Sequence, residues 1–351
     1  MTVFERLEDL PPDCAALFED ASARSFFLSL PWFSNLLRRG LQEEAAPRCF
    51  VSHSQGRCSG VLLMMQVPRT NQLMSLANYY SSLYMPLVRE EGVLQELAGQ
   101  VAKEKWAQID LHPMDADSPL FEKTAEAFRK AGMFVFPYFC FGNWYLKVEG
   151  RSYEEYFSSL PSKLKNTLKR KKKQLESMDG IRLEIVTGGD ELESAIESYV
   201  KVYNSSWKTP EPHPEFMPGL IRTCAALGWL RLGVIRMGEE AIAAQLWIVK
   251  DGIASIYKLA YDEKFSKLSA GSILTAALMQ HVLDVDHVHE VDYLTGDDAY
   301  KRDWMSHRRE RWGLSAYNRR TFSGLVSGLL QLAKNSVKDL LGKGSVRKGA
   351  E

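Results

Sequence analysis

Residues 241–272 have the sequence AIAAQLWIVKDGIASIYKLAYDEKFSKLSAGS, in which two apolar segments flank a Lys-Asp-Gly turn. Ala241–Val249 and Ile253–Tyr261 are strand-like, and an Asp-Gly pair between two such segments is a strong hairpin signal. Trp229–Arg236 has the same character and precedes a Met-Gly-Glu-Glu turn. Together these segments predict an antiparallel meander, followed by a glycine-containing loop and a helix over Ile273–Leu283.

The elements around this meander follow an order that occurs twice in the chain. In the second half, apolar spacing predicts helices over 152–159, 164–178, 190–203 and 214–227, and strands over 181–186 and 289–294. In the first half, it predicts strands over 49–53, 59–66, 106–111, 133–141 and 143–148, helices over 93–103 and 120–131, and a Tyr-rich strand or loop over 78–88. The repeated order of elements predicts two domains of similar α+β or α/β architecture, over residues 1–150 and 151–320. Each is expected to be a mixed, mainly antiparallel sheet flanked by helices.

The composition is that of an ordinary globular protein. The chain has 351 residues, 45% hydrophobic and 25% charged, and 44 Lys and Arg balance 44 Asp and Glu. These values exclude a globally disordered chain and a strongly basic nucleic-acid-binding protein. The five cysteines are scattered without a CxxC pair, so we expect free thiols rather than a zinc site or a disulfide framework. The chain has neither a secretory-signal pattern nor an apolar run approaching the ~20 residues that cross a bilayer, so we expect a cytoplasmic protein.

Two segments stand out by charge and amphipathicity. Seven Lys and Arg and no acid occur between Lys163 and Lys173. Most of these side chains are expected to be solvated, while those on one side could attract phosphates of CoA, tRNA or a lipid-linked sugar. The C-terminal segment 321–351 predicts an amphipathic, basic helix and tail. That helix either packs on the protein or contacts a partner or a membrane surface, which would place the protein at the inner face of the membrane.

Two motifs carry a resemblance to a known family. They are YDEKFSKLSAGS (261–272) and the pattern D-x-x-x-G-D-x-x-Y-K, formed by Asp292, Gly296, Asp297, Tyr300 and Lys301. Residues 155–310 resemble the CelD-type acyltransferases of the GNAT superfamily, which are similar in turn to the Fem-type aminoacyltransferases. The resemblance implies two GNAT-like domains, a degenerate one over 1–150 and an acyltransferase domain over 151–320.

The resemblance implies a cofactor site at the loop before the helix over 273–283. Small residues there would let backbone N–H groups approach a pyrophosphate. The expected cofactor-binding residues are Tyr257, Ser269, Ala270, Gly271 and Ser272. Two alternatives stay open: Ser269 is only a helix N-cap with Gly271 in a tight turn, and Tyr257 is only sheet packing. The usual GNAT loop, Q/R-x-x-G-x-G/A, is also altered, since Ser266 and Ser269 occupy its first and fourth positions.

The expected catalytic residues are Lys301, Asp292 and Tyr300. An ammonium at Lys301, in the Tyr-Lys position of Fem-type enzymes, would stabilise the charge that acyl transfer builds on a carbonyl oxygen. Asp292 ends a strand and could accept a proton from an attacking amine. The alternatives are a salt bridge from Lys301 to Asp297 or Asp298, and a turn-capping role for Asp292.

The loop 205–216 is the expected acceptor site. Trp207 could present a flat face to a sugar, and Lys208 and Glu211 could bind its polar groups. A proline-stiffened connector with Trp207 packed inward is the alternative. His287 and His289 have no evident third ligand, so no metal is expected.

These features predict an acyltransferase of the GNAT N-acetyltransferase type. It would move an acyl group from acetyl-CoA or another acyl-CoA to an amine or hydroxyl acceptor, which the resemblance suggests is an exopolysaccharide or envelope precursor. A Fem-like transferase using aminoacyl-tRNA is one alternative, and a non-catalytic module that binds a carbohydrate or lipid carrier is another. Sequence-specific nucleic-acid recognition is not expected, because no RNA- or DNA-binding motif accompanies the basic helix.

Overall fold

The computed structural model describes residues 2–42 and 44–346, with side chains described up to residue 336. The chain forms two compact units, each made of separate segments. Unit 1 comprises Met1–Ala21, Gln42–Cys140 and Glu310–Glu351, and unit 2 comprises Ser22–Leu41 and Phe141–Arg309. The sequence predicted contiguous domains over 1–150 and 151–320. In the structure, residues 22–41 belong to the second unit, and residues from 310 onward belong to the first.

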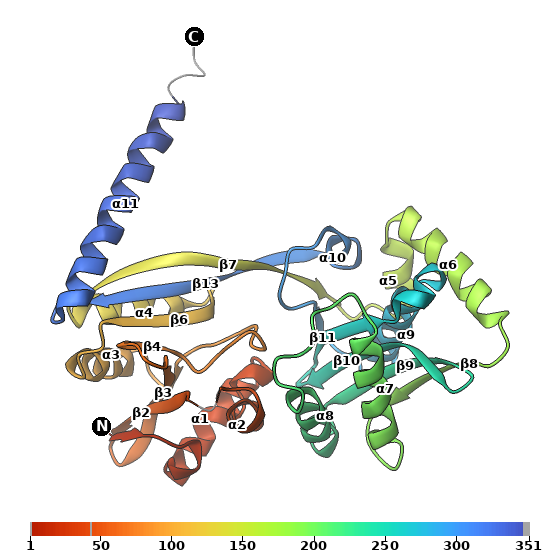
Figure 1. Ribbon diagram of the computed structural model, residues 1–351, viewed down its shortest axis with the longest axis horizontal. Helices are drawn as coiled ribbons and strands as arrows, with labels where there is room; N and C mark the ends of the chain where they lie inside the picture. The colour runs from red at the N-terminus through yellow and green to blue at the C-terminus, as the bar shows by residue number, and fades with distance from the viewer. Residues whose placement is uncertain (1, 43, 347–351) are drawn as a thin grey trace. The chain divides into compact units, whose positions relative to one another are not determined.

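Unit 1 is a mainly antiparallel sheet with helices (Figure 1). Its strand order is β1-β2-β3-β4-β6-β13-β7, with β4 and β6 parallel. The strands are β1 (Thr2–Phe4), β2 (Ala46–Ser54), β3 (Arg57–Gln66), β4 (Gln72–Ser75), β5 (Leu87–Val88), β6 (Gln108–Asp115), β7 (Met133–Lys147) and β13 (His307–Asn318). The helices are α1 (Ala15–Ser22), α3 (Val93–Lys103), α4 (Pro119–Lys130) and α11 (Phe322–Val346). Gln55 and Gly56 close the β2–β3 hairpin with positive φ angles of 52° and 74°, which suit a type I′ turn.

Unit 2 contains the predicted meander. Its strand order is β7-β12-β11-β10-β9-β8, with β11 and β12 parallel and the other neighbours antiparallel. The strands are β8 (Ile181–Val186), β9 (Leu230–Met237), β10 (Glu240–Lys250), β11 (Ile253–Tyr261) and β12 (Glu290–Asp292), with the ends of β7 and β13 that lie in this unit. The Asp-Gly hairpin is confirmed, since Asp251 and Gly252 both have positive φ.

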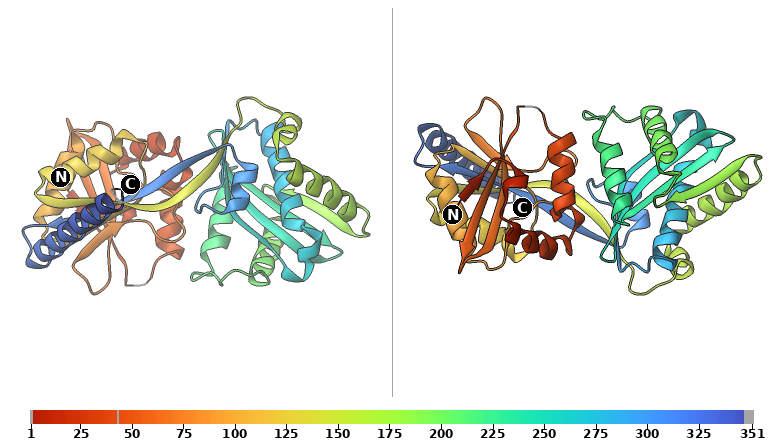
Figure 2. Two further views of the ribbon diagram at one scale, coloured as in Figure 1. Left: turned by 90° about the horizontal axis from the view of Figure 1, so that it is seen from above. Right: turned by 90° about the horizontal axis from the view of Figure 1, so that it is seen from below.

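Helices cover both faces of this sheet (Figure 2). α7 (Leu192–Asn204) and α8 (Phe216–Ala226) lie on one face, and α5 (Tyr153–Ser159), α6 (Ser162–Glu176) and α9 (Ala270–Asp284) lie on the other. α2 (Leu30–Arg39) and the short α10 (Ala299–Trp304) complete the unit. Trp247 and Ala243 of β10 pack with Leu274 and Leu278 of α9 in one buried cluster. The predicted fold class, a mixed and mainly antiparallel sheet flanked by helices, is confirmed.

Some sequence predictions of individual elements were wrong. The strands expected over 133–141 and 143–148 form one strand, β7, because Gly142 stays extended and does not interrupt it. β12 is shorter than expected, whereas the segment 78–88, predicted as a strand or a loop, is a loop apart from β5. The helix predicted over 190–203 begins two residues later, at Leu192 of α7, and its N-cap position is Glu191. Strand β13 was not predicted, since its Arg-rich start, HRRER, lacks apolar alternation.

Candidate functional site

The candidate site lies where two parallel strands of unit 2 part. The β11–β12 ladder runs from the Ile253–Glu290 pair to the Ser255–Asp292 pair. β12 ends at Asp292, while β11 continues to Tyr261. The acceptor loop, the turn with Lys301 and the start of α9 lie around this second half of β11.

Asp292 is held in a buried polar network at the end of β12. Its Oδ1 accepts hydrogen bonds from Asn143 Nδ2 (2.6 Å) and from the backbone N–H of Leu294 (2.7 Å). Its Oδ2 accepts a bond from Arg309 Nη2 (2.6 Å), and Arg309 also binds Glu290 at 2.8 Å. The bond to Leu294 is the turn-capping role considered from the sequence. The general-base role stays a prediction, and it would require Asp292 to exchange some of these partners for a substrate.

Lys301 is buried beneath the turn that follows β12, with 5% of its surface exposed. Its Nζ donates to the carbonyl oxygen of Thr295 (2.5 Å), lies 3.3 Å from Asp298 Oδ2, and sits 5.3 Å above the Tyr293 ring. Burial lowers the pKa of Lys301, while the negative charge of Asp298 opposes that shift. The Asp298 salt bridge considered from the sequence is therefore present, and the ammonium also ties down the turn.

Tyr300 lies at the outer side of this turn. Its ring meets the Tyr293 ring edge-on at 5.7 Å, and the side chain is 46% exposed. Burial of the hydroxyl and the charge of Asp298 raise its pKa to about 12, so the phenol keeps its proton at neutral pH. Asp297, the neighbouring acid, pairs with Arg308 at 2.9 Å and accepts from Trp144 Nε1 at 2.6 Å.

The predicted acceptor loop lies against the end of β11. Trp207 contacts the Tyr261 ring at 4.6 Å and is 49% exposed, so it is not packed inward. Glu211 pairs with Lys258 of β11 at 2.9 Å. A cavity of about 220 Å³ opens beside this pair and is lined by Tyr199, Val200, Tyr203, Asn204, Pro210, Glu211, Pro214 and Met217.

Lys208 connects the acceptor loop electrostatically to Lys301. Its Nζ lies 5.6 Å from the centre of the Tyr203 ring, over which Lys258 also lies at 5.8 Å. Burial and the positive charges of Lys258 and Lys301 together lower the pKa of Lys208 to about 8, against the opposing effect of Glu211 and Asp298. Such an amine is partly neutral near physiological pH. The structure thus brings the acceptor loop and the predicted catalytic lysine into one site.

The predicted cofactor loop adjoins the same part of β11. Residues Glu263–Leu268 form a 3₁₀ helix, and Ser269 follows in the left-handed region with a φ of 57°. Ser269 stands at the N-cap position of α9 without a side-chain capping bond. A Cβ atom on Gly271 would lie 3.2 Å from the Tyr261 ring, which places the start of α9 beside the site. Ala270 is buried, and Ser272 is partly exposed.

Tyr257 does not face this loop. Its ring packs with Phe26, Phe27 and Trp32 at 6.0–6.2 Å, and only 9% of its surface is exposed. These are the contacts expected if Tyr257 only packs against the sheet, which was the alternative to cofactor binding. Sequence reasoning also missed Asn143 and Arg309, whose partners lie far from them along the chain, so no local signal marked them.

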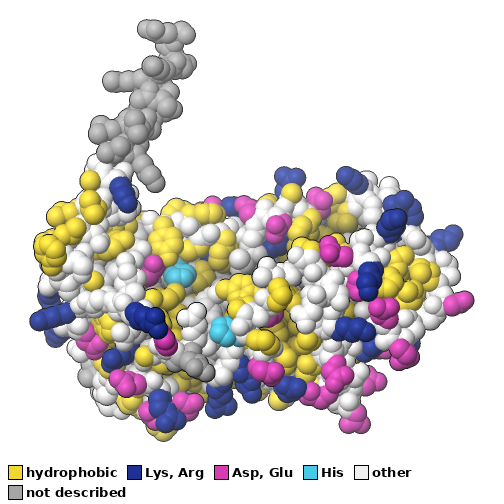
Figure 3. Space-filling view, in the orientation of Figure 1, with side chains coloured by type: hydrophobic (Ala, Val, Ile, Leu, Met, Phe, Trp, Pro, Cys, Tyr) yellow, Lys and Arg dark blue, Asp and Glu magenta, His cyan; other side chains and the backbone are white. Residues whose placement is uncertain are grey.

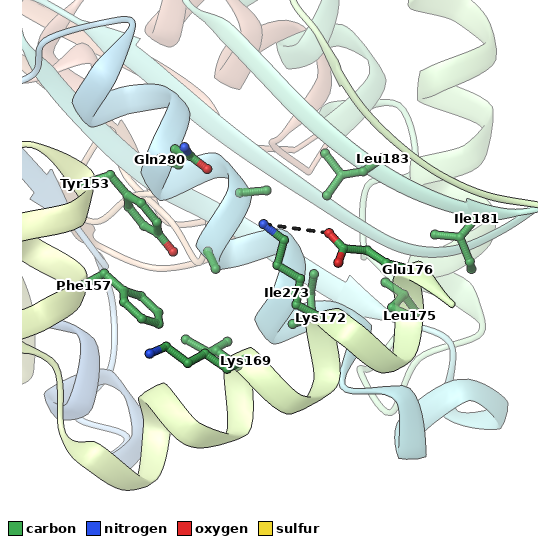
Figure 4. A pocket seen from close by; sticks show the side chains of 13 residues that line it. Tyr153, Phe157, Lys169, Lys172, Leu175, Glu176, Ile181, Leu183, Ile273 and Gln280 are labelled. Carbon is green, nitrogen blue, oxygen red and sulfur yellow. Dashed lines mark ion pairs between the residues drawn. The ribbon is translucent and has the colours of Figure 1, made fainter. Parts of the chain in front are cut away.

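A separate cavity of about 480 Å³ lies between α5, α6, β8 and α9 (Figure 4). Its wall is mostly apolar, and Lys169, Lys172, Glu176 and Gln280 supply polar groups. The sequence did not predict this cavity.

Over residues 2–42 and 44–336, no cluster of three or more His, Cys, Asp or Glu could hold a metal ion. No helix in the described part of the chain is both long and apolar enough to span a membrane.

Comparisons with known proteins identify the class of the C-terminal part. Residues 162–302 match the family model described as "Acetyltransferase (GNAT) domain". A comparison with curated protein sequences gave no match. Residues 162–302 therefore carry a GNAT-type domain, as the resemblance predicted for this part of the chain, and that domain is of the acyltransferase type.

Solved structures with similar folds extend over most of the chain. FemX matches with a TM-score of 0.61 and 11% identity, covering 91% of this chain and 97% of that chain. The C-terminal domain of a putative lysylphosphatidylglycerol synthetase from Agrobacterium fabrum has a TM-score of 0.55 and 13% identity, with coverages of 92% and 96%. L-PGS from Bacillus licheniformis has a TM-score of 0.51 and 14% identity, with coverages of 88% and 95%. The fold of the whole chain is thus the one that FemX has.

Proposed function

We propose that this protein transfers an acyl group from an acyl-CoA, with acetyl-CoA as the first donor to test, to an amine or hydroxyl group. The proposed acceptor is an exopolysaccharide or cell-envelope precursor in the cytoplasm. The observation that supports the proposal most is the gathering of Lys208, Glu211 and Lys301 around the second half of β11. This gathering lies within the segment that matches a GNAT domain.

The proposed chemistry is a direct acyl transfer. The acceptor attacks the thioester carbonyl, a C–N or C–O bond forms, the C–S bond breaks, and CoA leaves as the thiol. We assign stabilisation of the carbonyl oxygen to the Lys301 ammonium and acceptance of the acceptor's proton to the neutral form of Lys208. Tyr300, protonated at neutral pH, is the assigned proton donor to the leaving thiolate.

The acceptor would enter beside the loop 205–216. Trp207 presents an exposed ring that suits a sugar face, and the cavity beside Glu211 gives room for polar substituents. The donor phosphates would lie at the start of α9, where Ala270, Gly271 and Ser272 offer the first backbone N–H groups of the helix.

The test measures release of free CoA thiol from acetyl-CoA with panels of amino sugars and nucleotide-linked sugars. Acceptor-dependent thiol release above the rate of hydrolysis is the expected result. A melting temperature that rises with acetyl-CoA would locate the donor on the folded protein even before an acceptor is found. Neither thiol release nor a shift in melting temperature with any acyl-CoA would contradict the proposal.

A Fem-like reaction with aminoacyl-tRNA is the second candidate. The observation that favours it is helix α6, on which seven Lys and Arg lie between Lys163 and Lys173 with no acid. Such a helix suits a polyphosphate donor. Transfer of a labelled amino acid from charged tRNA, without activity from any acyl-CoA, would establish this candidate. Binding of a glycan precursor without transfer from either donor would identify a non-catalytic module.

A further inference from the structure

The 480 Å³ cavity of unit 2 has the size of a small-molecule site. Figure 4 shows Tyr153 and Phe157 of α5 on one side and Ile181 and Leu183 of β8 on another. Leu168, Leu175, Ile273, Ala276 and Ala277 complete an apolar interior. A site with this lining favours a hydrocarbon chain over a sugar or a nucleotide.

Positive charge borders this apolar interior. Lys169 and Lys172 of α6 both line the cavity, and the Lys169 ammonium lies 5.9 Å from the centre of the Phe157 ring. Lys172 meets Glu176 at 3.9 Å, and both side chains are more than 60% exposed, so this contact is weak. Two neighbouring lysines of α6 do not line the cavity and use their ammonium groups elsewhere. Lys165 donates to the Ser158 carbonyl, and Lys171 donates to the Lys267 carbonyl. Lys169 and Lys172 are therefore the cations available to a ligand in the cavity.

We propose that this cavity binds the hydrocarbon chain of a single-chain anionic lipid, whose head group is held by Lys169 and Lys172. The inference goes beyond the proposed acyl transfer and does not depend on it. The cavity lies in the angle between α5, α6 and α9, and none of its lining residues belongs to the candidate site at the end of β11.

The test measures binding of dodecyl phosphate to the full chain by calorimetry, well below its micellar concentration. Saturable binding at one site is expected. Dodecyl maltoside, which has the chain without the charge, and inorganic phosphate, which has the charge without the chain, should each bind at least tenfold more weakly. Lys169→Gln with Lys172→Gln should weaken dodecyl phosphate binding about tenfold at low salt and change maltoside binding little. Lys163→Gln with Lys173→Gln is the matched control, because these two exposed lysines of α6 do not line the cavity.

Two variants block the cavity itself. Ala277→Trp fills it, and Leu183→Glu places a carboxylate at its wall on a residue that is 40% exposed, where folding should be retained. Both should abolish dodecyl phosphate binding. Full affinity in either folded variant, or equal affinity for inorganic phosphate, would overturn the proposal. Acyl transfer is not the readout, so failure of this test leaves the proposed enzymatic activity unaffected.

A second inference comes from the orientation of α11 in unit 1. Gly324 and Gly328 face the unit, since a Cβ on Gly324 would lie 2.5 Å from the Asn318 oxygen and one on Gly328 would lie 2.3 Å from the Phe134 ring. The apolar side chains of the described part of this helix are exposed, and Figure 3 shows hydrophobic side chains on the surface next to the grey end of the chain. Their exposed fractions are 85% for Phe322, 37% for Leu325, 39% for Val326, 51% for Leu329, 57% for Leu330 and 40% for Leu332. The helix therefore packs through its glycines and presents its apolar side chains outward, which marks an interaction surface.

The positive charge near this surface indicates which kind of partner it binds. Over residues 319–336, Arg319, Arg320 and Lys334 are exposed and no acid occurs. An exposed apolar helix face with this excess of positive charge is complementary to an anionic bilayer surface. We infer that α11 lies on such a surface, with Phe322, Leu329 and Leu330 inserted at the level of the head groups.

Co-sedimentation with vesicles tests this inference. The protein should bind vesicles of 30% phosphatidylglycerol in phosphatidylcholine and bind pure phosphatidylcholine at least tenfold more weakly. Leu329→Ser with Leu330→Ser should reduce binding at least tenfold, whereas Ser323→Ala with Ser327→Ala, the control on the same helix, should leave it unchanged. Failure of the wild-type protein to bind anionic vesicles would overturn the inference. So would a dimer that dissociates in the Leu329→Ser, Leu330→Ser variant, because a second copy would then cover the surface.

Discussion

Lys301 has a structural role in addition to the proposed catalytic one. Its ammonium holds the turn after β12 through Thr295 and Asp298. Lys301→Met removes the charge and keeps the aliphatic stem. If the ammonium stabilises the transition state, turnover should fall roughly 10²–10³-fold while the affinity for the acyl donor changes little. Steady-state and donor-binding measurements would separate the two effects.

Asp298→Asn is the informative control for Lys301. It breaks the 3.3 Å salt bridge and leaves the ammonium in place. Near-normal turnover in Asp298→Asn together with the loss in Lys301→Met would support catalysis by the ammonium. Equal losses in both variants would assign Lys301 to the turn alone.

Lys208 predicts a pH dependence of both activity and stability. Its pKa is about 8 in the folded protein and near 10.4 in an unfolded chain. Between these values the unfolded state binds more protons, so the free energy of unfolding should rise from about pH 8 to pH 10. Lys208→Met should remove this rise and be the more stable protein at pH 7, as measured by urea unfolding.

The same residue should control the alkaline side of the activity profile. If the neutral amine accepts the proton of the acceptor, kcat/KM of the wild type should rise with pH through about 8. This rise of kcat/KM with pH should disappear in Lys208→Met. It should persist in Lys201→Met, the control at an exposed lysine of α7. A rise that persists in Lys208→Met would rule out this role.

At the scale of elements, Arg309 joins three strands of unit 2. It belongs to β13, bonds Asn143 of β7 at 2.7 Å, and bonds Glu290 and Asp292 of β12. Arg309→Met would leave two acids without their cation in a largely buried place. We expect a loss of roughly 3–5 kcal/mol in the free energy of unfolding, measured by denaturant titration. Arg182→Met, at an exposed pair with Glu239, should cost under about 1 kcal/mol.

Several strands of unit 2 could be predicted from sequence because their signals are local. Ile181–Val186 and Ile253–Tyr261 have the bounds expected from apolar alternation and turn residues. β13 could not be predicted, since its arginines are buried by pairing with acids that lie elsewhere in the chain. The proximity of Lys208 and Lys301 could not be predicted either. Motif spacing identifies each residue, but it does not show that both lie beside β11.

At the scale of the whole molecule, neither unit is a continuous segment of chain. Tyr257 packs with Phe26, Phe27 and Trp32 inside unit 2, and β6 of unit 1 pairs with Arg311–Tyr317 of β13. We therefore expect the fragments 1–150 and 151–351 to be unfolded or aggregated when expressed separately. Circular dichroism and light scattering would test this, and co-expression of both fragments is the control. A cooperatively melting fragment 151–351 would contradict the expectation.

The late position of β13 also has a consequence for biosynthesis. Strand β6 emerges from the ribosome roughly 200 residues before the strand that covers its edge, a delay of about 10–40 s at ordinary rates of translation. During that interval the nascent chain exposes an unpaired strand edge on an incomplete sheet, the kind of surface that aggregates. Synthesis of this protein should therefore depend on ribosome-associated chaperones until the C-terminal residues are released.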